Sequence, residues 1–109
     1  MRTHIVATYR HRVARVAVSE ITHFVSGDKY VTAHYPGGEL VIEDKMKDLE
    51  LEFPDFIRTH RFALARRSLI REYTSLDRKT GEVRLHGVSA PLPVSLSRIS
   101  TVKALFAEA

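Results

Sequence analysis

Arginine side chains gather around one short apolar run near the middle of the sequence. The stretch RTHRFALARR, residues 58–67, holds four arginines and a histidine around that run. The planar guanidinium of arginine can hold a phosphate group or a guanine edge through two hydrogen bonds. A core strand does not need these charges, and a solvated face more often mixes in acids. The run therefore indicates a surface that binds a polyanion.

Charge is distributed unevenly along the chain. The formal net charge is +4, but residues 43–55 hold six acids and two lysines, a local balance of −4, which leaves +8 for all other residues. Such segregation suits a domain that binds a polyanion with one face while another face stays solvated. Outside the central run, the basic side chains that support this interpretation are Arg10, Arg12, Arg15, Lys29, Arg71, Arg78, Lys79, Arg84 and Arg98.

The sequence lacks the motifs that are typical of catalytic, metal-binding and phosphate-binding sites. The chain has no cysteine, and its six histidines show no H-x-H or H-E-x-x-H pattern. It also lacks the G-x-S-x-G, G-x-x-x-x-G-K-[ST] and G-x-G-x-x-G motifs. The sequence therefore favours a binding domain without metal, cofactor or enzymatic activity. The histidines considered as ligands are His4, His11, His23, His34, His60 and His86.

Length and composition are typical of a small folded domain. The chain has 109 residues, of which 44% are hydrophobic and 28% charged. These values predict a single domain over residues 1–109 with its own hydrophobic core. No apolar run approaches the ~20 residues that cross a bilayer. The absence of cysteine and of a signal-peptide pattern leads us to expect a cytoplasmic protein that does not enter membranes.

Most of the sequence has the pattern of short β-strands. Residues 3–9 and 12–18 are rich in β-branched side chains and flank a polar turn. Residues 21–43 predict three strands, separated at Gly27-Asp28 and at Pro36-Gly37-Gly38, where a glycine with positive φ is expected. Residues 69–86 predict a hairpin with its turn around residues 78–81. The expected fold class is therefore mainly β.

Two segments interrupt the strand pattern with helical spacing. Asp44 is a candidate cap for a helix over residues 45–53, with Met46, Leu49 and Phe53 on one face. A second helix is predicted within residues 97–109, capped by Ser95 or Ser97. Its apolar stripe, which we expect to pack in the core, consists of Ile99, Val102, Leu105 and Phe106.

Residues 20–70 and 92–105 together resemble the LytTR family of bacterial DNA-binding domains. The resemblance rests on a strand ending in a small loop before an aromatic strand, then the pattern F-x-R-x-H-R, then P-V-S before a final helix. It implies an elongated fold of about ten short antiparallel strands in stacked sheets, with one mid-chain and one C-terminal helix. It also implies binding of double-stranded promoter DNA by loops in successive major grooves, an N-terminal receiver domain in the full-length protein, and two copies on tandem sites.

The resemblance carries DNA-contacting positions onto particular residues. The first loop of the family falls on Asp28 and Lys29, and the second places Arg61 where relatives more often have asparagine or serine. The residues themselves support Arg61, because Phe62 and Leu64 follow it and would point inward by strand alternation. Such packing would anchor the strand that presents Arg61.

Three further positions follow from the same resemblance. Arg66 matches a basic or amide position, and the third loop places Ser97 and Arg98 at the DNA. Relatives often carry the last arginine one residue earlier, so either Ser97 or Arg98 can hold the reading position. Two alternatives stay open: a protein-interaction domain for an acidic partner, and a single-stranded nucleic-acid or RNA-binding β module. The second would stack bases on its tyrosines, Tyr9, Tyr30, Tyr35 and Tyr73.

Overall fold

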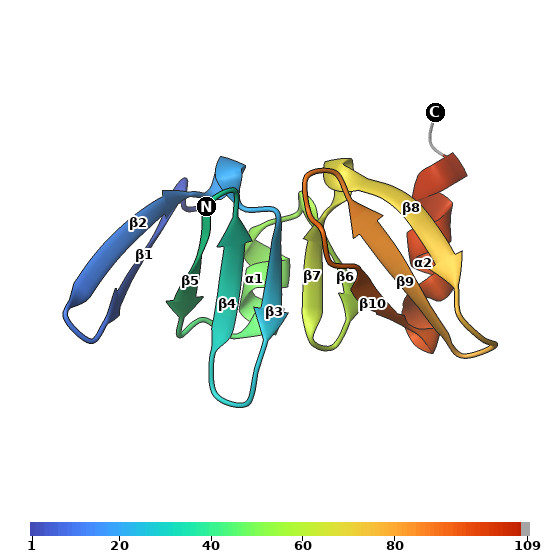
Figure 1. Cartoon of the computed structure of the whole chain (residues 1–109), viewed down its shortest axis with the longest axis horizontal. Coiled ribbons are helices and arrows are strands. Elements are labelled where there is room, and N and C mark those ends of the chain that lie inside the picture. Colours follow the sequence, from blue (N-terminus) through green and yellow to red (C-terminus); the bar gives the residue numbers. More distant parts are fainter. Residues whose placement is uncertain (108–109) are drawn as a thin grey trace.

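A computed structural model of the chain describes residues 1–107. The molecule is elongated, with principal extents of 45 × 30 × 26 Å, and its ten strands form three antiparallel sheets (Figure 1). The predicted mainly β fold with two short α-helices is thus confirmed. Within the described residues, no helix is both long enough and apolar enough to cross a membrane.

The three sheets follow one another along the long axis of the molecule (Figure 1). The first is the hairpin of β1 (His4–Tyr9) and β2 (Arg12–Ala17). The central sheet has the order β5-β4-β3-β7-β6, and the third has the order β10-β9-β8. The central strands are β3 (His23–Ser26), β4 (Val31–Tyr35), β5 (Gly38–Ile42), β6 (Phe56–His60) and β7 (Ala63–Arg66). The third sheet contains β8 (Ile70–Ser75), β9 (Thr80–Leu85) and β10 (Leu92–Ser95).

The central sheet separates two hydrophobic cores. Phe24 and Leu64 belong to the core that also contains residues of β1, β2 and the first helix, α1 (Met46–Glu52). Ala63 and Ala65, which alternate with Leu64 along β7, belong to the core shared with β9, β10 and the second helix, α2 (Ile99–Ala104). Strand β7 is therefore buried on both faces.

Helix α1 buries Met46 and Leu49, and Phe53 directly after it is also buried, as the helical spacing predicted. The predicted cap was wrong, because Lys45 occupies the N-cap position and no side chain caps the helix. The carboxylate of Asp44 instead accepts a hydrogen bond of 2.8 Å from Nη2 of Arg2. Arg2 also forms an ion pair with Glu52. Its two ion pairs therefore tie the N-terminal residues to both ends of the helix.

The C-terminal helix is shorter than predicted. A 3₁₀ turn, η3 (Leu96–Arg98), precedes α2, and neither Ser95 nor Ser97 makes a capping hydrogen bond. Val102 is fully buried and Ile99 and Leu105 pack against the second core, but Phe106, in a final 3₁₀ turn, is 48% exposed. The last two residues of the predicted helix, 108 and 109, lie outside the described part of the chain.

Two predicted turns differ in their details. The β8–β9 turn covers residues 76–79, slightly before the predicted position, because Oδ1 of Asp77 accepts hydrogen bonds from the amides of Lys79 and Thr80 at 2.7 and 2.8 Å. In the β4–β5 turn, Gly37 has the expected positive φ, 90°, whereas Gly38 is already part of β5.

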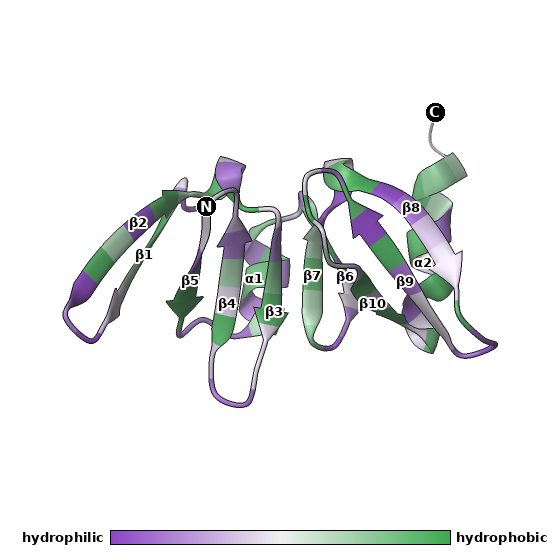
Figure 2. Ribbon diagram, viewed as in Figure 1, coloured by the Kyte–Doolittle hydropathy of each residue, from purple (hydrophilic) through white to green (hydrophobic). Residues whose placement is uncertain are grey.

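Several connections lie along one long edge of the molecule, at the bottom of Figure 1. We call this the loop edge. The first residue and the end of the last helical turn lie toward the opposite edge (Figure 1). In Figure 2 the turns of the loop edge are mostly hydrophilic, whereas the strands above them carry most of the hydrophobic residues. The loop edge comprises the β1–β2 turn (residues 10–11), the β3–β4 loop (27–30), the β6–β7 turn (61–62), the β8–β9 turn (76–79) and η3.

Candidate nucleic-acid interface

Arg58 holds the β6–β7 turn in place from inside the strand. Its Nε donates to the carbonyl oxygen of His60 at 3.0 Å, and its Nη2 donates to that of Arg61 at 2.8 Å. Its Nη1 bonds the carboxylate of Glu50, on α1, at 3.1 Å. The side chain of Arg58 is only 15% exposed. With three of its donors engaged, Arg58 positions the turn, and the residues after it project from the sheet.

His60 and a β-bulge add to the shape of this turn. The pairing of β6 with β7 shifts between Arg58 and His60, and Thr59, at this shift, is buried. Nδ1 of His60 accepts a hydrogen bond of 3.2 Å from the amide of Phe62, so that nitrogen carries no proton. Burial, followed by the nearby charges of Arg61 and Arg58, lowers the pKa of His60. The ring is therefore neutral near pH 7.

Arg61 projects from the turn toward solvent. Its guanidinium carbon lies 4.6 Å from the centre of the Phe62 ring, a cation–π contact that restricts the side chain. Within residues 1–107 this guanidinium makes no hydrogen bond and no ion pair, so its donors are available to a ligand. The expectation for Phe62 was wrong: it is 42% exposed because it lies in the turn rather than in β7, whereas Leu64 is buried as predicted.

Arg61 shares a groove with the residues after β10. The groove, about 440 Å³ in volume, is lined on one side by the β6–β7 segment and on the other by the end of β10 and η3. The fold thus brings Arg61, Ser97 and Arg98 together, although Arg61 and Ser97 lie 36 positions apart in the sequence. Ser97 is exposed and Arg98 half-buried. No acid lies among the lining residues, which are Arg58, His60, Arg61, Ser95, Ser97 and Arg98.

Asp28 and Lys29 lie in a different part of the loop edge. The β3–β4 loop is closed by a hydrogen bond of 2.8 Å from the amide of Gly27 to the carbonyl oxygen of Tyr30, and its four residues are exposed. Asp28 and Lys29 line a shallow hollow of about 380 Å³ together with Tyr9 and Tyr30. The structure therefore separates the predicted residues into two groups on the same edge.

Arg66 has internal partners. Its Nε donates to the carbonyl oxygen of Ile21 at 2.9 Å, and its Nη2 donates to that of Val18. The guanidinium carbon lies 4.5 Å from the centre of the Phe56 ring, and burial lowers the pKa of the group. Arg66 is the last residue of β7, at the end away from the β6–β7 turn. These contacts tie the segment before β3 to β7.

Comparison with known proteins identifies the family to which the chain belongs. Residues 11–107 match the family model described as the LytTr DNA-binding domain, and the chain belongs to that family. Members are DNA-binding domains rather than enzymes. The chain is 37% identical, over 70 residues, to the positive alginate biosynthesis regulatory protein of Pseudomonas aeruginosa, so its sequence is similar to that of the alginate regulatory protein AlgR.

The match to that relative is partial. It covers 63% of this chain but 28% of the relative. Among solved structures, a LytTr DNA-binding domain from Bacillus cereus, assigned to a methyl-accepting/DNA response regulator, superposes with a TM-score of 0.84. This superposition covers 97% of this chain and 98% of that one at 17% sequence identity, so it supports the fold.

Sequence reasoning named three of the residues that line the groove, Arg61, Ser97 and Arg98, but it missed the residues that shape the β6–β7 turn. Arg58 counted as one more basic side chain, and Phe62 as a core residue. One signal could have identified Phe62: an aromatic residue directly after an arginine, in a segment that must turn between two strands.

Proposed function

We propose that this chain binds double-stranded promoter DNA in a sequence-dependent manner through its loop edge. Arg61 and either Ser97 or Arg98 would contact base edges from the groove that they share. Lys29 and the other exposed basic residues of the loop edge would contact phosphates and supply much of the affinity. The neighbouring Asp28 can accept a hydrogen bond from a cytosine amino group. Under this proposal the domain acts in the cytoplasm without a metal or a cofactor.

The observation that carries this proposal is the state of Arg61. It is exposed, held over Phe62 and unpaired within residues 1–107, next to Arg98 in a groove without acids. An arginine that is already restricted loses less conformational entropy when it binds. Its planar fork matches the O6 and N7 atoms of guanine in the major groove.

The dimensions of the molecule suit a duplex ligand. One turn of B-DNA is about 34 Å long, and the long axis of the protein measures 45 Å, the length of about 13 base pairs. The β3–β4 loop and the groove at Arg61 lie at different points along that axis (Figure 1). They would therefore contact a duplex at two places on one of its sides. Arg66 is left out of the proposed interface, because its guanidinium bonds two backbone carbonyls.

We further propose that the chain is the effector domain of a response regulator, preceded by a receiver domain. The name of the B. cereus protein, which includes the words DNA response regulator, supports this proposal, and so does the 28% coverage of the P. aeruginosa regulatory protein, which leaves most of that relative outside the match. The first residue lies toward the edge opposite the loop edge (Figure 1), so a domain joined there would leave the proposed interface open. Two copies on tandem sites would place two such interfaces along one promoter.

Competition and selection experiments together test the proposal. A labelled duplex selected from a random pool should be displaced by unlabelled duplex of the same sequence much better than by either single strand. The observed binding constant should also fall steeply with salt, because phosphate binding releases counterions. Selection that enriches no motif would contradict sequence-dependent reading.

Two other outcomes would favour the alternatives. Preference for single strands would favour base stacking, for which Tyr9 and Tyr30 are exposed by 49% and 46%, while Tyr35 and Tyr73 pack against the two cores. Binding of an acidic protein without duplex binding, and with a salt dependence less steep than several phosphate contacts would give, would favour the protein-interaction alternative.

A further inference from the structure

The tip of the β1–β2 hairpin holds an arginine in a backbone conformation that favours glycine. Tyr9 pairs with Arg12, so the turn consists of Arg10 and His11. Arg10 has φ = 58°, and it is the one non-glycine residue in the described part of the chain with positive φ. Side chains with a Cβ adopt this region at a cost. An arginine placed there suggests that its side chain serves a function at the tip.

The tip presents positive charge that forms no ion pair within residues 1–107. Arg10, His11 and Arg12 are all exposed, and residues 1–19 contain no acid. The guanidinium carbon of Arg10 lies 5.4 Å from the centre of the Tyr9 ring, which restricts the side chain. No partner within residues 1–107 hydrogen-bonds to or pairs with this guanidinium.

The tip adjoins a segment that the proposed function already uses. Tyr9, the last residue of β1, lines the same hollow of about 380 Å³ as Lys29 and Tyr30 of the β3–β4 loop. The hairpin tip and this loop lie at the same edge of the molecule (Figure 1). Arg10 follows Tyr9 directly, so the loop edge continues past Lys29 to the end of the molecule. A duplex lying along this edge would pass next to both the hairpin tip and the β3–β4 loop.

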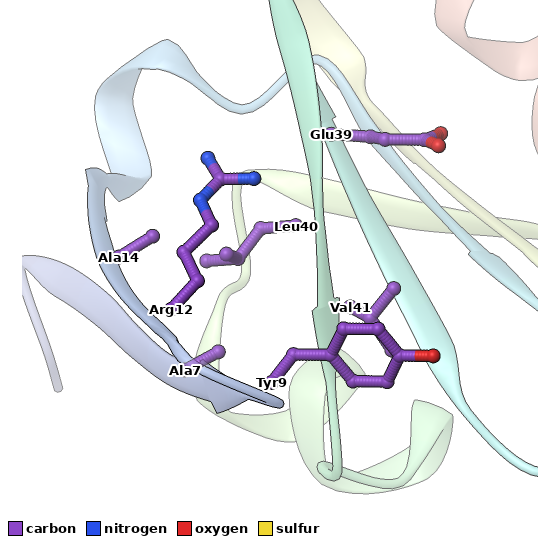
Figure 3. Close-up of a pocket in the computed structure, with 7 residues that line it drawn as sticks. All are labelled: Ala7, Tyr9, Arg12, Ala14, Glu39, Leu40 and Val41. Atoms are coloured by element: carbon purple, nitrogen blue, oxygen red, sulfur yellow. The ribbon is translucent and has the colours of Figure 1, made fainter.

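Arg10 and Arg12 differ in where their side chains point. Arg12 lines a cavity of about 190 Å³ between the hairpin and β5, which Tyr9, Glu39 and Leu40 also line. Figure 3 shows its guanidinium directed into that space, on the side of the hairpin that faces β5. Arg10, in the turn itself, is the arginine at the free end. It also lies just outside residues 11–107, the part of the chain that matches the family model.

We propose that Arg10 binds a DNA phosphate that flanks the segment contacted by Lys29 and Arg61. The contact would lengthen the segment of DNA that the protein covers by the width of the hairpin. It would add affinity without sequence preference. This inference rests on the proposed binding of duplex DNA. It goes further by assigning to the hairpin a role as a backbone clamp at one end of the site.

The test compares two arginines of the same hairpin. Arg10→Gln removes the charge at the tip, and Arg15→Gln removes the same charge from the middle of β2, where Arg15 is exposed opposite Val6. On a long selected duplex, Arg10→Gln should weaken binding about threefold to tenfold at low salt. It should also reduce the slope of log K against log[salt] by about 0.9, the value for one phosphate. Arg15→Gln should leave the slope unchanged.

Two further measurements identify the contact as a flanking phosphate. The loss in Arg10→Gln should be equal on selected and scrambled duplexes, and it should vanish when the duplex is trimmed from one end but not from the other. Arg10→Gly should bind as weakly as Arg10→Gln while its melting temperature stays the same or rises, because glycine adopts φ near 58° without strain.

The outcomes separate this inference from the proposed function. Equal salt slopes for wild type, Arg10→Gln and Arg15→Gln would overturn the role of Arg10. If Arg61→Ala still weakened binding in that case, the proposed function would stand. A wild-type chain that binds no duplex would overturn both.

Discussion

Replacement of Arg58 by methionine tests whether this residue builds the β6–β7 turn. Methionine has similar length but no donors, so Arg58→Met removes the bonds to the carbonyl oxygens of His60 and Arg61 and the ion pair with Glu50. We assign about 1 kcal/mol to each carbonyl bond and at most about 1 kcal/mol to the partly buried ion pair. The free energy of unfolding should therefore fall by about 2–3 kcal/mol.

Urea unfolding, followed by far-UV circular dichroism, measures this loss. For a chain of 109 residues the same loss should lower the melting temperature by roughly 10 °C. Arg71→Met is the matched control, because Arg71 is an exposed residue of β8, and it should change the free energy of unfolding by less than about 0.5 kcal/mol. If Arg58→Met also stayed within about 0.5 kcal/mol of wild type, the three bonds would not stabilise the turn, and the reasoning would fail.

Two further predictions concern the buried polar groups. His23 is 6% exposed and stacked on His34 with ring centroids 4.4 Å apart; burial, then the nearby His34, lowers its pKa from 6.5 to about 4. The unfolded chain thus binds more protons between these values, and the free energy of unfolding should fall by up to about 3 kcal/mol as the pH drops from 7 to 4. Urea unfolding at several pH values should show that the free energy of unfolding falls less in His23→Gln than in the wild type. An equal fall in both would exclude His23 as the cause. Oγ1 of Thr59 is buried without a hydrogen-bond partner among residues 1–107, so Thr59→Val should raise the free energy of unfolding by about 1 kcal/mol. Destabilisation would show that the hydroxyl is satisfied.

Local sequence patterns predicted the strands well because their determinants are local. Gly27-Asp28 does separate β3 from β4, and Gly37 does supply a positive φ between β4 and β5. The family resemblance added the arrangement of the sheets, which strand patterns alone do not determine. The side-chain roles were harder to predict, because several depend on partners far away in the sequence.

The predictions that were wrong concern residues whose roles depend on such distant partners or on the exact position of a turn. Asp44 has the right position for a cap, but its carboxylate bonds Arg2, 42 residues earlier. Phe62 fits an alternating strand only if the strand begins at Arg61, whereas the bulge in β6 places both residues in the turn. Arg58 and Arg61 are identical in type and three residues apart, yet the first bonds backbone carbonyls and the second faces solvent. Only coordinates distinguish them.

Parallel selection of duplexes by the wild-type chain, Arg61→Ala and the control Arg71→Ala tests the central claim most directly. Arg71 carries the same charge but follows the start of β8, which lies on the edge opposite the loop edge (Figure 1). We expect Arg61→Ala to bind the wild-type motif about 1–3 kcal/mol more weakly and to lose preference at one base pair, while Arg71→Ala enriches the wild-type motif. An unchanged motif for Arg61→Ala, with equal losses of affinity on selected and scrambled duplexes, would contradict base reading by Arg61.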